Sequence, residues 1–427
     1  MKGIVKLITA VFFLLLTACD HNRIRPDSDH DYDNVVIFYA AGYFPGQNDL
    51  SNSIRTNINE IKQGYLPTRK SRDVVILLTH LTDDDDAYMV RMYRDRKGLV
   101  CDTLATYPQY KPFARAENFK EYLTEVKDRF DAGHYGLILS SHGSGWAPEG
   151  YFLNPSKYES GNVLFSPGPA QFPRGTNPYS GTNRYNPDML TKSMFVESGV
   201  ERGVSVTYEM DIDVLKESLP VHLDYLIFDA CYMGCVEVLS ELKDVADRIV
   251  SSQTEIVGSG LDYVNMMSRL IEQPSPDLKG LCQDFYDKYD AYRDGDWRKT
   301  CLVSLVDCGG LDRLASVAGE LNARYAESLA GVAPHQVQYY FCSPDIPLFY
   351  DLLDIYREAG ISDSDMALLS AAVDDCVECK FTTNFILNNI RVERFSGLSM
   401  YLPCGGTRYL SNYYKTLTWN GEVGLVK

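Results

Sequence analysis

Short apolar runs alternate with stretches of helical periodicity along most of the chain. The apolar runs are continuous and often rich in β-branched residues, which is typical of strands buried on both faces. They cover residues 35–41, 73–79, 135–139, 225–228, 248–251 and 302–306. Apolar positions at helical spacing predict helices over residues 57–63, 117–130, 211–218, 234–244 and 278–293. Strands that alternate with helices favour an α/β fold with a mostly parallel central sheet covered on both faces.

Two regions depart from this alternation. Residues 147–210 are rich in Gly, Pro, Ser, Asn and Tyr without a sustained period, so they are predicted to form an irregular insertion, either functional or flexible. Later in the chain, two helical patterns precede a terminal apolar strand; the three cover residues 311–330, 348–359 and 397–403. The pattern therefore predicts a core of residues 35–310 and a C-terminal subdomain of residues 311–427.

The N-terminus has the pattern of a processing signal. Two lysines flank the start, and the apolar run at residues 7–16 is too short to span a bilayer. The small residues before Cys19 resemble a bacterial lipobox, which predicts cleavage there and acylation of Cys19. Residues 1–18 would then be a lipoprotein signal peptide and residues 19–34 a flexible tether. A lipid would anchor the folded part to the bacterial cell envelope, outside the cytoplasm, at the outer membrane or cell surface. The alternative is an ordinary cleaved signal with a chance cysteine.

Composition narrows the functional classes. The 427 residues include 41 Lys+Arg and 58 Asp+Glu, which gives a formal net charge of −17. With 45% hydrophobic and 23% charged residues, the chain is not expected to be disordered throughout. The acidic balance argues against nucleic acid as a partner, because the phosphate backbone would be repelled. It is compatible with attraction of the Lys or Arg side chains of another protein.

Two of the predicted strands end in reactive residues. His142 and Gly143 follow the strand at residues 135–139, and Cys231 follows the strand at residues 225–228. The active sites of open parallel sheets lie at the carboxyl ends of the strands, and a histidine with a cysteine there is what thiol-based nucleophilic catalysis requires. The N–H of Gly143 can face an oxyanion. Each residue alone is more often structural, but their placement at matching strand ends favours the catalytic interpretation.

These residues resemble the clostripain family of cysteine peptidases, which belongs with the caspases, legumains and gingipains. The two motifs that carry the resemblance are Ser141-His142-Gly143 and Asp229-Ala230-Cys231-Tyr232-Met233-Gly234. The resemblance extends over most of the chain, from about residue 35 to residue 403. It implies a caspase-like α/β/α sandwich and a cysteine endopeptidase with Cys231 as nucleophile and His142 as general acid/base. It also implies that the N–H groups of Gly143 and Cys231 bind the oxyanion.

The resemblance extends to substrate selection. Asp229 matches the acidic residue that family members place in the S1 pocket, where a carboxylate would select a P1 Arg and, less strongly, Lys. Two alternatives remain: Asp229 caps backbone N–H groups at a strand end, or the enzyme prefers another P1 residue such as Asn. The sequence departs from the family at Leu261, where members usually carry Trp in a loop that lines this pocket.

Family members are made as inactive precursors and are cut after a basic residue between the two motifs. The candidates here are Lys157, Arg174, Arg184, Lys192 and Arg202. Lys157, soon after the histidine motif, is the first choice. The alternative is a surface loop that is never cut.

The resemblance implies no cofactor for the chemistry and no metal among the site residues. Calcium dependence occurs in the family, and the four aspartates at residues 83–86 are a plausible calcium site, although a solvated acidic loop is the commoner outcome. The expected substrates are proteins or peptides with exposed Arg or Lys. The main alternative function is a non-catalytic surface-binding lipoprotein that keeps the peptidase fold. The intact pair of His142 and Cys231 favours the enzyme.

Overall fold

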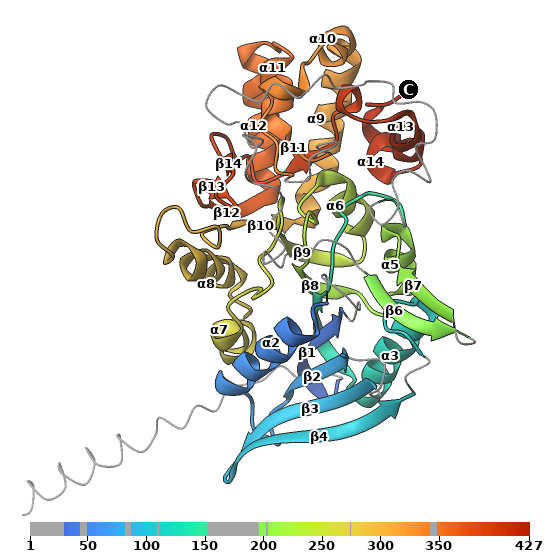
Figure 1. Ribbon diagram of the computed structural model, residues 1–427, viewed down its shortest axis with the longest axis vertical. Helices are drawn as coiled ribbons and strands as arrows, with labels where there is room; N and C mark the ends of the chain where they lie inside the picture. The colour runs from blue at the N-terminus through green and yellow to red at the C-terminus, as the bar shows by residue number, and fades with distance from the viewer. Residues whose placement is uncertain are drawn as a thin grey trace, which may run out of the picture.

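The computed structural model describes most of the chain (Figure 1): residues 30–42, 49–81, 87–108, 111–149, 151, 196–201, 204–273, 275–341 and 348–427. Within these ranges the centre of the molecule is a nine-stranded sheet. Its strands are β1 (Tyr32–Ala41), β2 (Asp73–His80), β3 (Ala87–Asp95), β4 (Gly98–Tyr107), β5 (Ala132–Ser140), β8 (Leu223–Asp229), β9 (Ala246–Ser251), β10 (Leu302–Asp307) and β12 (Val377–Thr382). They lie in the order β12-β10-β9-β8-β5-β1-β2-β3-β4.

Three two-stranded sheets lie outside the main one. They pair β6 (Val196–Glu201) with β7 (Val204–Glu209), β11 (Tyr350–Asp351) with β15 (Ser399–Met400), and β13 (Phe385–Ile386) with β14 (Ile390–Arg391).

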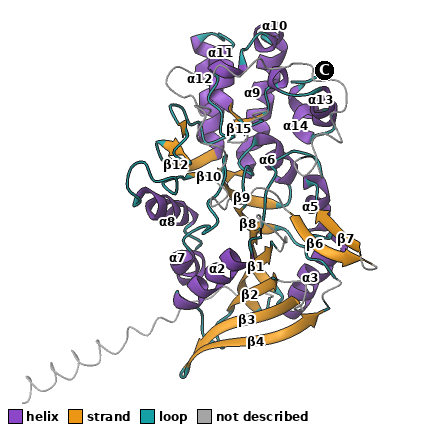
Figure 2. Ribbon diagram, in the orientation of Figure 1, coloured by secondary structure: helices purple, strands orange, loops and turns teal. Residues whose placement is uncertain are grey.

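Helices cover both faces of the main sheet (Figure 2). On one side lie α2 (Ser51–Gln63), α7 (Tyr263–Met267) and α8 (Leu278–Asp290), and on the other lie α3 (Ala116–Arg129), α5 (Ile212–Ser218) and α6 (Val236–Leu242). The C-terminal part adds α9 (Leu311–Arg324), α10 (Ala326–Ala330), α11 (Leu352–Glu358), α12 (Asp363–Cys376), α13 (Arg408–Tyr414) and α14 (Thr418–Val423). The result is an α/β/α arrangement.

The prediction of a parallel sheet is confirmed for the five central strands, β9-β8-β5-β1-β2, which pair in parallel throughout. The pairings at both flanks, β2-β3, β3-β4, β9-β10 and β10-β12, are antiparallel, so the whole sheet is mixed. The six apolar runs predicted as strands of the core all lie in strands. Buried strands covered on both faces need side chains that are apolar on both faces. The carboxyl ends of the five central strands therefore meet along one edge.

The structure differs from the sequence-based expectation in several places. The hairpin of β3 and β4 was not expected, because the outer strand β4 alternates between half-buried and exposed positions and has no continuous apolar run. Helix α2 begins at Ser51, ahead of the predicted start at residue 57. The β6–β7 hairpin lies within residues 147–210, which were predicted to be irregular.

The C-terminal part of the chain shares the main sheet. Of the apolar run at residues 397–403, only Ser399–Met400 is a strand, because its partner β11 is two residues long. Strand β12, which also comes after residue 310, pairs with β10 and forms one edge of the main sheet. The main sheet therefore continues across residue 310, and the proposed division of the chain at that residue stays a prediction.

Several predictions lie outside the described residues. They are the signal peptide at residues 1–18, Cys19, the acidic run at residues 83–86 and the candidate processing sites Lys157, Arg174, Arg184, Lys192 and Arg202. In the described part of the chain, none of the helices has the length and apolar character needed to cross a membrane.

Candidate active site

The register of two central strands brings the histidine and cysteine motifs together. Strands β5 and β8 pair in parallel, and the last pair is Ser140 with Asp229. The backbone N–H of Ser141 continues this ladder by donating to the carbonyl oxygen of Asp229 at 3.4 Å. Each motif then leaves the sheet, so His142 and Cys231 both follow two residues after the last pair. The two loops therefore begin side by side at the same edge of the sheet.

Gly143 lies directly against the backbone of Cys231. A methyl group added at Gly143 would clash with the carbonyl oxygen of Cys231 and would lie 2.9 Å from its nitrogen. Only glycine allows the two backbones to approach so closely. The two N–H groups that the family resemblance implies as oxyanion donors thus come from backbone segments in direct contact.

The thiol of Cys231 is buried and has a polar partner. Its Sγ accepts a hydrogen bond from the backbone N–H of Ile256 at 3.2 Å, and the Ile256 carbonyl oxygen lies 3.9 Å from the same sulfur. Ile256 belongs to the loop that follows β9. An N–H that donates to sulfur stabilises the thiolate, which is the reactive form of cysteine.

The turn after Cys231 is fixed from two sides. Tyr232 has a φ of 63°, a left-handed conformation that non-glycine residues rarely adopt. Its N–H donates to the carbonyl oxygen of Thr254 at 3.1 Å. Its ring stacks on Phe349 from the C-terminal part of the chain, with centroids 4.8 Å apart and an interplanar angle of 4°. These contacts hold the backbone in a conformation that would otherwise cost about 1–3 kcal/mol.

His142 lies on the α5 side of the sheet edge. Its side chain lines a small cavity of about 30 Å³ together with Ser144 from its own loop, Met233 from the cysteine loop and Leu215 from α5. His142 is 2% exposed and Cys231 is 0% exposed. Both residues are therefore covered in this structure, although their loops are in contact.

Asp229 is fully buried behind Cys231. Its Oδ2 accepts hydrogen bonds from Ser140 Oγ at 2.9 Å and from the hydroxyl of Tyr263. Burial, together with the charge of Asp229, holds the pKa of Tyr263 well above its usual value, so the hydroxyl stays protonated and donates. Gly260, with a φ of 62°, lies over the carboxylate: a methyl group added there would be 2.7 Å and 2.9 Å from the two carboxylate oxygens.

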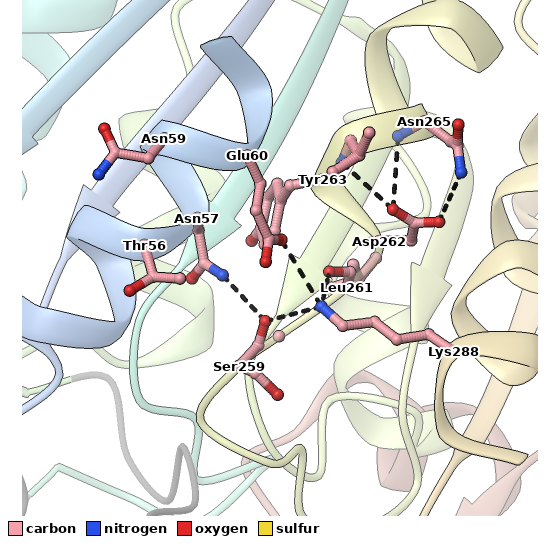
Figure 3. A network of polar contacts seen from close by, with 12 residues as sticks. Thr56, Asn57, Asn59, Glu60, Ser259, Leu261, Asp262, Tyr263, Asn265 and Lys288 are labelled. Atoms are coloured by element: carbon pink, nitrogen blue, oxygen red, sulfur yellow. Dashed lines mark hydrogen bonds and ion pairs between the residues drawn. The ribbon is translucent and has the colours of Figure 1, made fainter. Parts of the chain in front are cut away.

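The loop that covers Asp229, residues 259–261, is held by helices α2 and α8 (Figure 3). Asn57 Nδ2 donates to the carbonyl oxygen of Ser259 at 2.9 Å, and Tyr289 OH donates to that of Gly260 at 2.7 Å. Lys288 Nζ donates to the carbonyl oxygens of Ser259 and Leu261 at 3.1 and 2.8 Å. Sequence analysis did not single out these three residues. The contacts join distant parts of the chain, and the available signal was only that all three residues lie on predicted helices.

The part of the chain that the structure describes holds no group of three or more His, Cys, Asp or Glu side chains arranged to bind a metal ion. The acidic run at residues 83–86, a plausible calcium site or a solvated acidic loop, is outside that part. Its assignment stays a prediction.

The caspase-like α/β fold, with a histidine and a cysteine at neighbouring strand ends, is that of a cysteine peptidase. The chain belongs to the clostripain family of these enzymes, whose family profile matches residues 42–158 and 205–400, more than half of its length. The comparison with curated proteins gave no match.

Solved structures of similar proteins agree with this fold. An inactive zymogen C11 protease from Parabacteroides distasonis is 22% identical with a TM-score of 0.72, over 92% of this chain and 98% of that chain. A secreted C11 cysteine protease from Bacteroides thetaiotaomicron, "iotapain", is 21% identical with a TM-score of 0.70, over 92% and 99%. A secreted C11 cysteine protease from the same organism, in complex with an irreversible peptide inhibitor, is 19% identical with a TM-score of 0.67, over 92% and 99%. These likenesses confirm the predicted caspase-like architecture.

Proposed function

We propose that this cysteine peptidase is an endopeptidase that cleaves after Arg, and less strongly after Lys, through an acyl-thioester on Cys231. The observation that carries the proposal is the register of β5 and β8, which brings the loops of His142 and Cys231 together at one sheet edge. Asp229 lies two residues before the cysteine on the same strand end. One edge of the sheet would thus supply the nucleophile, the proton donor and the P1-selecting carboxylate.

The reaction would proceed in two halves. The Cys231 thiolate, stabilised by the Ile256 N–H, attacks the carbonyl carbon of the scissile bond, and the negative charge moves to the carbonyl oxygen. The N–H groups of Gly143 and Cys231 bind that oxyanion. His142 then donates a proton to the leaving amine, and the C–N bond breaks to leave a thioester. In the second half, His142 takes a proton from water, the hydroxide oxygen attacks the thioester, and the thiolate leaves.

The surroundings of Asp229 support a cationic P1 side chain. The carboxylate is completely buried, and a buried charge is costly unless a charge of the opposite sign or strong hydrogen bonds compensate it. Ser140 and Tyr263 both bind Oδ2 and so fix the orientation of the carboxylate. A guanidinium can add two parallel charge-assisted hydrogen bonds to a carboxylate, whereas an ammonium offers a single point charge. Arg is therefore the expected first choice.

The burial of His142 and Cys231 supports synthesis as a latent precursor. One of the structures with a similar fold is an inactive zymogen. The proposed activation is cleavage between the two motifs after a basic residue, with Lys157 as the first choice. Mutation of Lys157 to Ala should slow activation in the absence of added protease.

The remaining proposals concern location and partners. The peptide inhibitor bound to one similar protein supports peptide substrates, and the secreted character of the Bacteroides relatives supports a site outside the cytoplasm. The proposed anchor is a lipid on Cys19. A Cys19→Ala variant should lose metabolic labelling with radioactive palmitate; retained labelling would contradict the anchor. Calcium is proposed as a modulator of activity at residues 83–86.

The central test compares residues 20–427 with the same protein carrying Cys231→Ala. Both are treated with trace trypsin, the trypsin is quenched, and fluorogenic peptides with P1 Arg, Lys, Asn and Asp are assayed with and without calcium. Cleavage after Arg that disappears in Cys231→Ala is the expected result. Cleavage only after another residue would keep the nucleophile and exclude the role of Asp229. No Cys231-dependent cleavage of any peptide would overturn the proposal in favour of a binding lipoprotein.

A further inference from the structure

The loop of residues 259–261 is the wall nearest to the Asp229 carboxylate. A methyl group added at Gly260 would lie 2.7 Å and 2.9 Å from the two carboxylate oxygens, so no larger residue fits at this position. The residue that begins α7 after this loop, Tyr263, binds the same carboxylate through its hydroxyl. A shift of this loop would therefore change both the space beside Asp229 and the orientation of its hydrogen-bond partner.

The sequence of this loop is intrinsically flexible. Gly258 and Gly260 flank Ser259, and Gly260 has a left-handed backbone. Glycines gain more conformational freedom than other residues when a segment loosens. Contacts from α2 and α8 therefore help to hold the observed conformation, beside the local turn bond from the Gly260 N–H to the Val257 carbonyl at 2.8 Å. Those contacts are hydrogen bonds to its three successive carbonyls: Asn57 and Lys288 bind the outer two (Figure 3), and Tyr289 binds the middle one.

Among these three residues, Lys288 contacts both ends of the loop. Its ammonium binds the carbonyl oxygens of both Ser259 and Leu261, and thus joins the two ends of the segment that carries Gly260. Hydrogen bonds from a charged donor are stronger than neutral ones. The same ammonium lies 3.7 Å from the carboxylate of Glu60 on α2, and this pair is mostly buried, with side-chain exposures of 22% and 24%. Burial raises the pKa of Glu60, and the charge of Lys288 partly counteracts that rise.

We propose that Lys288 is a positioning residue for P1 recognition: by bridging the ends of the 259–261 loop, it keeps Gly260 and Tyr263 in place around Asp229. This inference rests on the proposed function, in which Asp229 receives a basic P1 side chain. Lys288 would not touch the substrate or Cys231. Its loss should therefore weaken the binding of a P1 Arg while leaving the reactivity of the thiol unchanged.

The test compares the wild type with Lys288→Met, Lys288→Arg and the control Lys299→Met. Lys299 follows α8 and pairs with Asp294 and Asp290 at 3.0 and 3.2 Å, without a contact to the loop, so its substitution makes the same chemical change elsewhere. All four proteins are activated identically. Four quantities are measured. They are KM and kcat for P1-Arg peptides, the inactivation rate with a P1-Arg irreversible peptide inhibitor, and the alkylation rate of Cys231 by iodoacetamide, read by mass spectrometry of the Cys231 peptide.

In Lys288→Met, we expect KM and the inactivation half-time with the Arg inhibitor to rise about tenfold, the usual scale for losing a charge-assisted hydrogen bond. The value of kcat and the alkylation rate of Cys231 should stay within about twofold, a split that general destabilisation would not produce. Lys288→Arg should recover most of the loss, because it keeps a charged donor. Lys299→Met should match the wild type.

The possible failures are distinguishable. If the wild type shows no preference for P1 Arg over P1 Asn or Asp, the proposed function fails and the inference fails with it. If the wild type prefers Arg and Lys288→Met keeps that preference and its KM, the proposed function stands and the inference is overturned. If KM, kcat and thiol alkylation all change together in Lys288→Met, its role is structural, and the inference is likewise overturned.

Discussion

Gly143 and Cys231 show how much of the site depends on single residues. Both lie within three residues of the end of a strand, so they could be assigned as candidates from the motif and from the rule for strand ends. Lys288 and Tyr289 could not be assigned in this way, because they act on carbonyl groups of a loop about 30 residues earlier in the chain. Backbone acceptors leave no pattern in the sequence. The sequence therefore indicated the candidate catalytic residues, but not the residues that hold the surrounding loop in place.

The contact between Gly143 and Cys231 leads to a direct prediction. Gly143→Ala forces the histidine loop away from Cys231, because the added methyl group clashes with the Cys231 carbonyl. The proposed oxyanion donor moves with it, so kcat should fall about 10²- to 10³-fold, the usual effect of losing such a donor. The measurement is steady-state kinetics on a P1-Arg peptide, with the melting temperature as a check on folding.

Gly421→Ala is the matched control, since the same methyl group at that helical position meets nothing within 4 Å. It should leave kcat unchanged. A Gly143→Ala variant with wild-type kcat would rule out the oxyanion role of Gly143.

At the scale of elements, α6 links the cysteine loop to the C-terminal part of the chain. Its buried residue Glu237 accepts hydrogen bonds from the N–H of Tyr401 at 2.8 Å and from the hydroxyl of Tyr414 at 2.7 Å. Burial raises the pKa of Glu237 from 4.5 to about 7. Below about pH 4.5 the carboxyl is protonated in both folded and unfolded chains. Between 4.5 and 7 the folded chain holds the proton more tightly, so this group's contribution to stability falls as the pH rises through that window.

The matching prediction concerns Glu237→Gln, which keeps the shape of the side chain and stays neutral at every pH. The melting temperature of the variant relative to the wild type should rise between pH 5 and pH 8, because only the wild type ionises a buried group. The shift in pKa sets an upper limit of about 3 kcal/mol on the corresponding change in the free energy of unfolding of the variant relative to the wild type. Thermal unfolding at both pH values measures it. An equal difference between the two proteins at pH 5 and pH 8 would show that Glu237 does not titrate in this range.

The elements also show why the fold was partly predictable. Strands β1, β2, β5, β8 and β9 are central and were recognisable as apolar runs. The hairpin of β3 and β4 was missed because one face of an outer antiparallel strand is in contact with water and its pattern alternates. Strand β12 was missed for a related reason, since its residues are all half-buried or exposed at the other edge of the sheet. Periodicity therefore identified the centre of the sheet and not its edges.

At the scale of the whole molecule, the C-terminal part supports the site. Phe349 stacks on Tyr232 and also contacts Gly145, so one ring packs against both the loop of Cys231 and the loop of His142. Strand β12 covers the outer edge of β10, in which Leu302, Val303 and Leu305 are buried. Without the C-terminal part, β10 would present an unpaired apolar edge, a feature that promotes aggregation.

A chain that ends at residue 310 should therefore be insoluble or unfolded, although the sequence pattern places a division there. Expression of residues 20–310 next to residues 20–427, with solubility and circular dichroism as readouts, tests this. A soluble, cooperatively folding protein with Cys231-dependent activity would show that the core is an independent domain and would contradict the prediction.

The burial of Asp229 between Ser140, Tyr263 and Gly260 has a consequence for how specificity can evolve. A single substitution that removes the carboxylate takes away the acceptor that two buried hydroxyls share, and the loss of such an acceptor costs about 1–3 kcal/mol. An enlarged residue at position 260 is excluded for as long as the carboxylate is there. Under the proposed function, a lineage that abandons basic substrates would therefore need coordinated replacements of Asp229 and of its hydroxyl partners Ser140 and Tyr263. Preference for a basic residue would thus be a historically durable trait of this scaffold.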